Sequence, residues 1–372
     1  MVTTSVAPAI SLVRMSLTRT AAAAAVVLAA LGTTGAQTPA AHPASPQPRP
    51  APARPQTSQP AVPAPAPVVP VQAAPLPHSP QEPDLAYGAF QRGYYLTAFK
   101  EAMTRIDRGG DKGDMHAMTL LGELYASGLG VPQDDVKAAK WYRLAADRGD
   151  RDAMFALGLF HVTRRGGLHD RSEAAKLFAS AAKLGSPAAA YDLGLFYLEG
   201  QLFPQDFQKA AELFRIAAQA GNSEAQYALA TLYKDGRGVP QDPVESAKLL
   251  AAASLADNVD AEVEYAITLF NGYQKDGAVL IPKDETRAVK LFQRAALKGS
   301  PIAQNRLARF LMIDRQGMRA NPAQALKWHL IARAGGNGDP VLEQYMAKQP
   351  PEVKAQAEKL AAPWLAVLTP KS

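Results

Sequence analysis

Residues 115–150 read MHAMTLLGELYASGLGVPQDDVKAAKWYRLAADRGD, and this stretch decides the fold. One motif of this stretch is the pair Leu121-Gly122, and a second is the run from Ala138 to Ala146. Both motifs recur along the chain. A repeat of about 36 residues with two helical patterns is typical of a solenoid of stacked helix pairs. We therefore predict an all-α fold, an α/α solenoid of about six repeats. The first motif occurs as Leu121-Gly122, Leu157-Gly158, Leu193-Gly194, Leu229-Ala230, Tyr265-Ala266 and Leu307-Ala308.

The landmarks within one repeat have steric causes. Ala117, Leu121 and Tyr125 follow the i, i+4, i+8 spacing of a helix stripe that faces a partner helix. Gly122 is expected to leave room for a neighbouring backbone. In the second helix, small residues permit close approach, and Trp141 with its neighbouring tyrosine fills the gap between successive pairs.

Polar and glycine residues mark the helix ends. Asp134, Asp206 and Asp242 are predicted N-caps of second helices, and Pro243 suits a first helical position. Ser186 followed by proline begins a first helix in the same way. The second helices are expected to end at glycines in the left-handed conformation, namely Gly149, Gly185, Gly221, Gly299 and Gly336.

These spaced letters resemble the Sel1-like repeat, a relative of the tetratricopeptide repeat. The resemblance covers about residues 115–339 and includes the loop GVPQD, which occurs at 130–134 and again at 238–242. It implies the helix-pair solenoid and a role in binding proteins. Two loops depart from the pattern, at 164–170 and between Gly272 and Asp284, and we expect both to deviate from the family geometry.

The N-terminal part predicts export. Arg19, an apolar run from Ala21 to Leu31 and small residues ending at Ala36 are typical of a signal peptide at 1–36, with Met1 or Met15 as the start. The run is too short to span a bilayer, so no integral span is expected after cleavage. Residues 37–83, which hold about half of the 30 prolines, are predicted to form a disordered tether. We expect the protein to be periplasmic or secreted.

The ends of the array are predicted to be capping units, because a solenoid exposes an apolar face at each end. Residues 84–114 resemble a degenerate first helix pair. Residues 340–372 contain two helical patterns, at 340–348 and 352–360, which are divided by two prolines.

Composition excludes several function classes. The chain has 372 residues and no cysteine, which excludes disulfides, thiol catalysis and thiolate metal sites. The net charge is +6, of which about +3 remains after residue 84, with both signs interspersed. Because no basic face with stacking aromatics is visible, no nucleic-acid partner is expected.

No pattern indicates catalysis. The six histidines are scattered, and none has the spacing of a zinc helix. No nucleophile elbow, phosphate-binding glycine loop or dinucleotide fingerprint occurs, since the glycines of the loops at 128–130 and 236–238 suit turns. We therefore expect no enzyme activity, no cofactor and no metal site.

The candidate site is the concave wall that first helices form in tetratricopeptide-like arrays. The same apolar side chains could instead fill the space between helices, and the sequence leaves both interpretations open. Polar flanks that would give specificity are Glu224, Asp235 and Arg309. The predicted partner-binding groove consists of Phe155, Leu159, Val162, Tyr191, Leu195, Leu198, Tyr227 and Lys234.

The leading hypothesis is an interaction scaffold or regulatory adaptor that binds a protein or peptide of the cell envelope. An envelope enzyme of β-lactamase-like type is the first alternative, suggested by a cysteine-rich branch of the family whose cysteines this chain lacks. A peptidoglycan- or polysaccharide-binding protein is the second. The partner, the pathway and the oligomeric state are not readable from the sequence.

Overall fold

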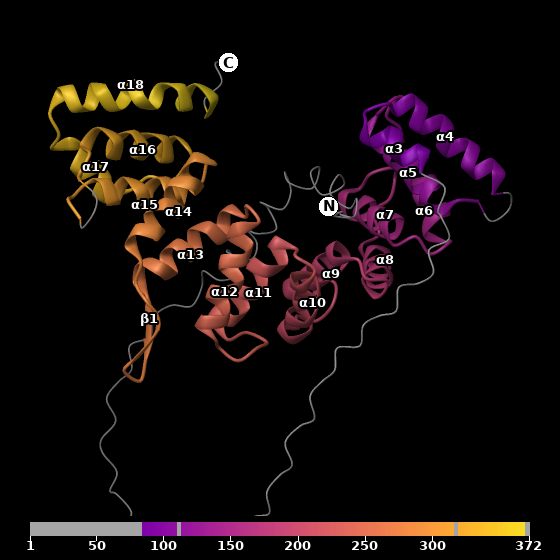
Figure 1. The fold of residues 1–372 in the computed structure, drawn as a ribbon, viewed down its shortest axis with the longest axis horizontal. Helices are drawn as coiled ribbons and strands as arrows, with labels where there is room; N and C mark the ends of the chain where they lie inside the picture. Colours follow the sequence, from indigo (N-terminus) through magenta and orange to yellow (C-terminus); the bar gives the residue numbers. More distant parts are fainter. Residues whose placement is uncertain (1–83, 110–112, 316–318, 369–372) are drawn as a thin grey trace, which may run out of the picture. The chain divides into compact units, whose positions relative to one another are not determined.

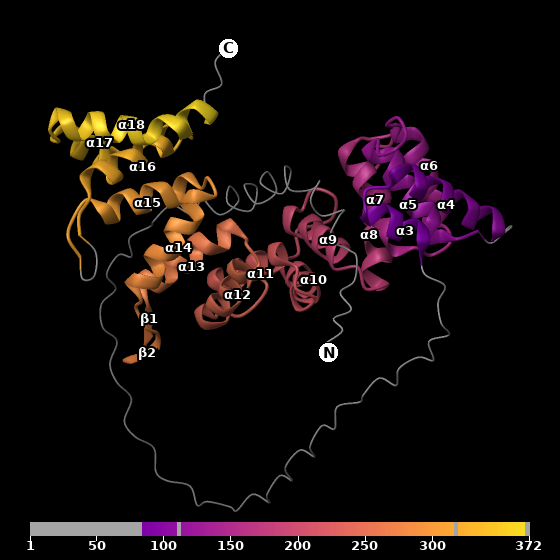
Figure 2. The same cartoon turned by 45° about the horizontal axis from the view of Figure 1, so that its top comes forward.

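The computed structural model describes residues 84–109, 113–315 and 319–368, which belong to one compact unit spanning 83–372. The predicted signal peptide and tether lie outside the described residues. Within the unit, helix pairs follow one another in sequence order from α3 and α4 to α17 and α18 (Figures 1 and 2). The described chain is a helical solenoid, as the repeat predicts.

Each repeat supplies one first helix and one second helix that pack against each other and against the next pair. The first helices are α5 (Met115–Ser127), α7 (Arg151–Thr163), α9 (Pro187–Glu199), α11 (Ser223–Asp235), α13 (Val259–Asn271) and α15 (Pro301–Leu311). The second helices are α6 (Asp135–Ala146), α8 (Arg171–Lys183), α10 (Phe207–Gln219), α12 (Pro243–Leu255), α14 (Glu285–Leu297) and α16 (Pro322–Ala334).

The glycine of the repeat motif faces an aromatic ring of its own repeat. A Cβ atom on Gly122 would lie 2.6 Å from the Tyr142 ring, and one on Gly194 would lie 2.6 Å from the Phe214 ring. Both rings are buried. The expectation that Gly122 leaves room for a neighbouring backbone is therefore wrong, because a side chain of the partner helix occupies that space.

The predicted caps are confirmed where the structure describes them. The side chains of Asp134, Asp206 and Asp242 accept hydrogen bonds from the first-turn amides of α6, α10 and α12. Ser186 caps α9, whose first residue is proline. The five predicted glycines all have positive φ, between 83° and 94°. These local interactions fix where each helix starts, so equivalent positions of successive repeats fall in register.

Ion pairs about one repeat apart join neighbouring units. Arg143 contacts Glu173 at 3.2 Å, and Lys234 contacts Glu264 at 3.0 Å. A further pair lies within one repeat: Glu262 on α13 is 0% exposed and lies 2.8 Å from Arg294 Nε on α14. A buried carboxylate with bound cations favours one arrangement of neighbouring helices, since breaking such a pair is costly.

The two unusual loops differ from the family loop, as expected. The loop after α7 begins at Arg164, which adopts a left-handed conformation with φ 58°. The loop after α13 contains a β-hairpin of β1 (Tyr273–Lys275) and β2 (Ala278–Ile281), paired antiparallel with an irregularity after Tyr273. Asp276 and Gly277 form its turn, both with positive φ. The hairpin itself was not predicted.

Helices cover both ends of the array. Before it lie α3 (Leu85–Gln91) and α4 (Tyr95–Arg108), whose alanines are buried against α5. After it lie α17 (Pro340–Ala347) and α18 (Pro351–Leu368), and α18 continues eight residues beyond the predicted end at 360. Ala357 and Ala361 of α18 are buried in one cluster with Trp328 of α16. No helix among the described residues is long and apolar enough to cross a membrane.

Candidate interaction surface

The predicted groove residues all lie on first helices, in three neighbouring repeats. Asp150, Ser186 and Asn222 cap α7, α9 and α11 through the same hydrogen bond to the first turn, so the three helices present equivalent positions. We call the surface formed by these side chains the first-helix face. It consists of Phe155, Leu159, Val162, Tyr191, Leu195, Leu198, Tyr227 and Lys234.

The apolar members on α7 and α9 are only partly covered. Phe155, Leu159, Leu195 and Leu198 are half-buried and pack on the cores of their own repeats. Val162 is the most open, with 38% of its surface exposed. Phe155 and Leu159 pack on one core cluster and Leu195 and Leu198 on another, and each keeps part of its surface accessible, so these side chains both fill the core and offer apolar surface.

The two tyrosines serve mainly as core residues. Tyr191 and Tyr227 are each 7% exposed. The Tyr191 ring lies 5.6 Å from the ring of Phe214 on α10, and Tyr227 packs with Leu250 of α12. A partner on the first-helix face therefore meets little more than their hydroxyl ends.

The predicted polar flanks are already engaged in part. Lys234 pairs with Glu264 of the next repeat at 3.0 Å, and Asp235 contacts Arg237 at 3.6 Å. Arg309 binds Asp339 at 2.6 Å, which lowers the pKa of that carboxyl by a hydrogen bond to the guanidinium. Glu224 accepts a hydrogen bond only from its neighbour Ser223 among the described residues.

Two carboxyls that the sequence did not single out lie on the same helices. Asp192 is on α9, three residues before Leu195 and hence on the same side of the helix. Asp260 is on α13, 36 residues after Glu224 and at the equivalent position. A comparison of equivalent first-helix positions for charge finds Asp260 together with Glu224, whereas Asp192 has alanine at the equivalent position of the next repeat.

Burial raises the pKa of Asp192 to about 7, and the nearby Glu224 carboxylate adds to this effect. The pKa of Asp260 is raised for the same reasons, first by desolvation and then by Glu264. A carboxyl group with a pKa near 7 is unusual on a protein surface. This part of the molecule therefore holds negative charge at a cost in free energy.

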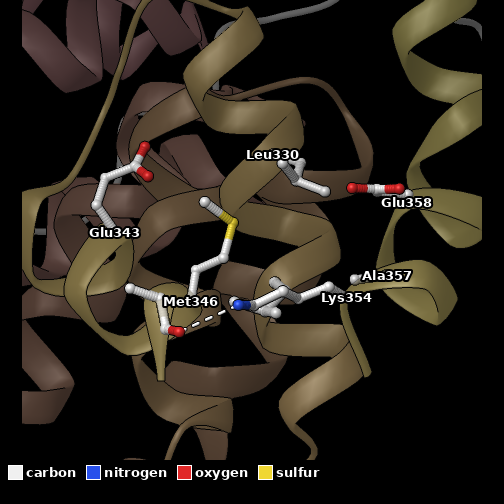
Figure 3. Close-up of a pocket in the computed structure, with 8 residues that line it drawn as sticks. Leu330, Glu343, Met346, Lys354, Ala357 and Glu358 are labelled. Carbon is white, nitrogen blue, oxygen red and sulfur yellow. Dashed lines mark hydrogen bonds between the residues drawn. The ribbon is translucent and has the colours of Figure 1, made fainter. Parts of the chain in front are cut away.

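A cavity of about 280 Å³ lies elsewhere, between α16, α17 and α18 (Figure 3). Leu330 and Met346 contribute apolar surface, and Glu343 and Glu358 lie toward its sides. Lys354 Nζ donates a hydrogen bond to the carbonyl oxygen of Ala347 at 3.1 Å. In the parts of the chain that the structure describes, no group of three or more His, Asp or Glu side chains is placed to hold a metal ion.

The fold and the first-helix face define a class of protein, the α/α solenoids of short helix-pair repeats. Within that class, the sequence profile of the Sel1 repeat matches six consecutive segments that make up more than half of the chain, so the protein belongs to the Sel1 repeat family. The matched segments are 116–150, 151–186, 187–222, 223–258, 260–300 and 301–337. Proteins of this family generally serve as protein–protein interaction scaffolds.

Solved structures share this fold. A Sel1 repeat protein from Oxalobacter formigenes is 26% identical with a TM-score of 0.58, and the match covers 68% of this chain and 97% of that protein. A protective antigen of uropathogenic Escherichia coli is 22% identical with a TM-score of 0.59, and the match covers 76% of this chain but only 61% of the antigen. A comparison with curated proteins finds no match.

Proposed function

We propose that this protein is an exported scaffold or regulatory adaptor of the bacterial periplasm, which holds a partner protein or peptide on its first-helix face. The observation that carries the proposal is the set of side chains on α7 and α9 that remain partly open after the core is filled, with Val162 as the most accessible. The chain belongs to the Sel1 repeat family, whose members generally serve as interaction scaffolds, and this supports the same role.

The role of an interaction scaffold needs no catalytic group. An interaction surface needs partly exposed apolar side chains with polar residues around them, and the first-helix face has both. Lys234, which belongs to this face, forms a partly exposed salt bridge with Glu264. Exposed pairs of this kind contribute more to choice of partner than to affinity.

Photocrosslinking in the cell envelope tests the surface. A photoreactive amino acid replaces Val162 on α7 in one variant and Val136 on α6 in the other, because both valines are exposed and lie on different kinds of helix. We expect a discrete crosslinked adduct with the partner from the variant at position 162 and none from the variant at position 136. Equal adducts at both positions, or adducts at 136 alone, would refute the assignment of the face.

The location is tested separately. The predicted signal peptide ends at Ala36, so we expect the mature protein to begin at Gln37 and to be released with the periplasmic fraction. Mass spectrometry of the N-terminus of the fractionated protein measures this directly. An intact N-terminus on protein from the cytoplasmic fraction would contradict export.

A further inference from the structure

Three carboxyls form a row beside the apolar part of the first-helix face. Asp192 lies on α9, Glu224 on α11 and Asp260 on α13, so each of three consecutive repeats contributes one. We call this set the acidic row. In α15 the position equivalent to Asp260 is occupied by Ile302 and that equivalent to Asp192 by Arg306, so the negative charge does not continue into the last repeat.

The acidic row is not neutralised within the protein. Across the described residues, none of Asp192, Glu224 and Asp260 forms an ion pair, although twenty pairs of oppositely charged side chains occur elsewhere. The nearest lysine on this face, Lys234, already contacts Glu264 at 3.0 Å. The three carboxylates therefore remain available to a cation from outside.

Two tyrosines of the first-helix face have free hydroxyls. Tyr191 and Tyr227 are more than nine-tenths buried, but their hydroxyl oxygens reach the surface and have no hydrogen-bond partner among the described residues. The buried Tyr142, by contrast, donates its hydroxyl hydrogen to Glu123 at 3.1 Å. Burial raises the pKa of Tyr191, and the charges of Asp192 and Glu224 raise it further, so this hydroxyl lies close to the acidic row.

Asp260 is exposed to solvent, yet desolvation is the first cause of its raised pKa, followed by the charge of Glu264. By contrast, backbone hydrogen bonds lower the pKa of Asp134 and of Asp170, which cap second helices. A cation beside Asp192 or Asp260 would therefore meet carboxylates whose charged form is disfavoured in the free protein.

We propose that the acidic row and the two tyrosine hydroxyls bind a basic segment of the partner, one that carries several lysine or arginine side chains. This rests on the proposed function and specifies its ligand. The carboxylates supply the charge that an ammonium or guanidinium group needs, and the hydroxyl oxygens of Tyr191 and Tyr227 accept further hydrogen bonds from it. The half-buried leucines at 159, 195 and 198 contact the apolar parts of the same segment.

Fluorescence anisotropy with labelled peptides tests the proposal on the purified protein. The probes are a twelve-residue peptide of alternating lysine and alanine, and the same peptide with glutamine in place of lysine. At low salt we expect the lysine peptide to bind at least tenfold more tightly, and the difference to shrink as salt screens the charges. Equal affinity for the two peptides, or no binding of either, would overturn the proposal.

Two variants with the same change in net charge separate a specific site from general attraction. The first combines Asp192→Asn, Glu224→Gln and Asp260→Asn. The second combines Asp147→Asn, Glu212→Gln and Glu358→Gln, which are exposed directly after α6, on α10 and on α18. We expect only the first to lose the tenfold preference. An equal effect of both variants would show that the acidic row has no special part in binding.

A third variant keeps the charge and the packing. Tyr191→Phe combined with Tyr227→Phe removes only the two hydroxyls. We expect the variant to bind the lysine peptide severalfold more weakly, with an unchanged thermal midpoint of unfolding. Unchanged affinity would exclude the hydroxyls from the site. If photocrosslinking at position 162 still captures a partner while the lysine peptide shows no preference, the interaction surface stands and the basic segment does not.

Discussion

At the scale of single residues, the glycine of the repeat motif and the ring it faces form one packing unit. Gly194 contacts the buried ring of Phe214, while the fourth repeat has alanine at 230 and the smaller Leu250 in the equivalent places. The fifth repeat combines Ala266 with Phe292, so the pairing of sizes is a tendency rather than a rule. In the third and fourth repeats, the size of the residue in the first helix therefore matches the size of the side chain that faces it.

Gly194→Ala tests this packing. Alanine favours a helix over glycine by up to about 1 kcal/mol, but its Cβ would lie 2.6 Å from a ring that is 0% exposed and has nowhere to move. Overpacking costs about 1–3 kcal/mol, so we expect a net loss of about 1 kcal/mol in chemical denaturation. Gly88→Ala, where only Arg92 lies near the new atom, should instead stabilise the protein.

The rescue is a second part of the same test. Adding Phe214→Leu to Gly194→Ala recreates the pair that the fourth repeat carries. We expect the double variant to be more stable than the sum of the two single changes predicts, by about 1 kcal/mol. Additive losses would show that the ring and the glycine are independent.

Asp192 makes stability depend on pH. Its pKa of about 7 in the folded protein lies above the value of 3.8 for a free carboxyl, so the folded state binds more protons between these values. Stability should therefore fall as pH rises through this window and level off above it. Asp192→Asn removes the dependence, and the groups that interact with Asp192, Glu224 and Tyr191, stay in place.

Thermal denaturation at pH 5 and pH 8 measures the effect. Because water still reaches the carboxyl, we expect Asp192→Asn to gain only about 1–2 kcal/mol at pH 8 and much less at pH 5. A larger gain at pH 5 than at pH 8 would reverse the sign and contradict the raised pKa.

At the scale of helices, one carboxylate contributes twice to the attachment of the C-terminal helices, beside the apolar packing of α18 on α16. Asp339 is 7% exposed and accepts hydrogen bonds from two first-turn amides of α17, while its oxygens also bind Arg309 of α15. One side chain therefore caps a helix and joins it to the preceding repeat. Such a double role makes the last helices sensitive to a single substitution.

Asp339→Ala should release α17 and α18 without unfolding the first repeats. The lost cap and the unpaired Arg309 together cost about 2–3 kcal/mol. We expect faster amide hydrogen exchange in 340–368 and no change in 115–183. Asp339→Asn keeps a capping side chain and loses only the charge, so its effect should be smaller. Uniform acceleration across the chain would show that the array unfolds as one unit.

The elements also show what a sequence can and cannot predict. The caps and the left-handed glycines were predictable because each depends on a few neighbouring residues, as at Asp206 and Gly221. The hairpin after α13 was missed although Asp276-Gly277 between short strand-like runs is a known signal. An inserted loop has no equivalent in the other repeats, so the period that locates every helix gives no information about it.

The candidate surface was only partly predictable, for a different reason. The sequence places Tyr191 and Leu195 on one side of a helix, but the burial of each depends on which side chain the next helix presents, here Phe214 for the tyrosine. The repeat period does not indicate Asp192, because the equivalent position in the next repeat is Ala228. Repeats reveal what is shared among units, whereas an interaction surface depends on what differs between them.

At the scale of the whole solenoid, stability and recognition are divided between two kinds of helix surface. The surfaces between first and second helices contain the buried alanines and rings, and they hold neighbouring repeats together. The outward side of the first helices adds partly exposed leucines and the acidic row. Because each unit contacts mainly its neighbours, single substitutions on the outward side should change binding with little effect on the fold.

The division between the two kinds of helix surface can be measured by hydroxyl-radical footprinting of the protein with and without its crosslinked partner. We expect the partner to protect Val162, Leu195 and Leu198 on first helices from oxidation. Val136, Leu144 and Ile216, which are exposed on second helices, should be oxidised as in the free protein. Protection of the second-helix residues, with no change at 162, 195 and 198, would contradict the claim that first helices hold the partner.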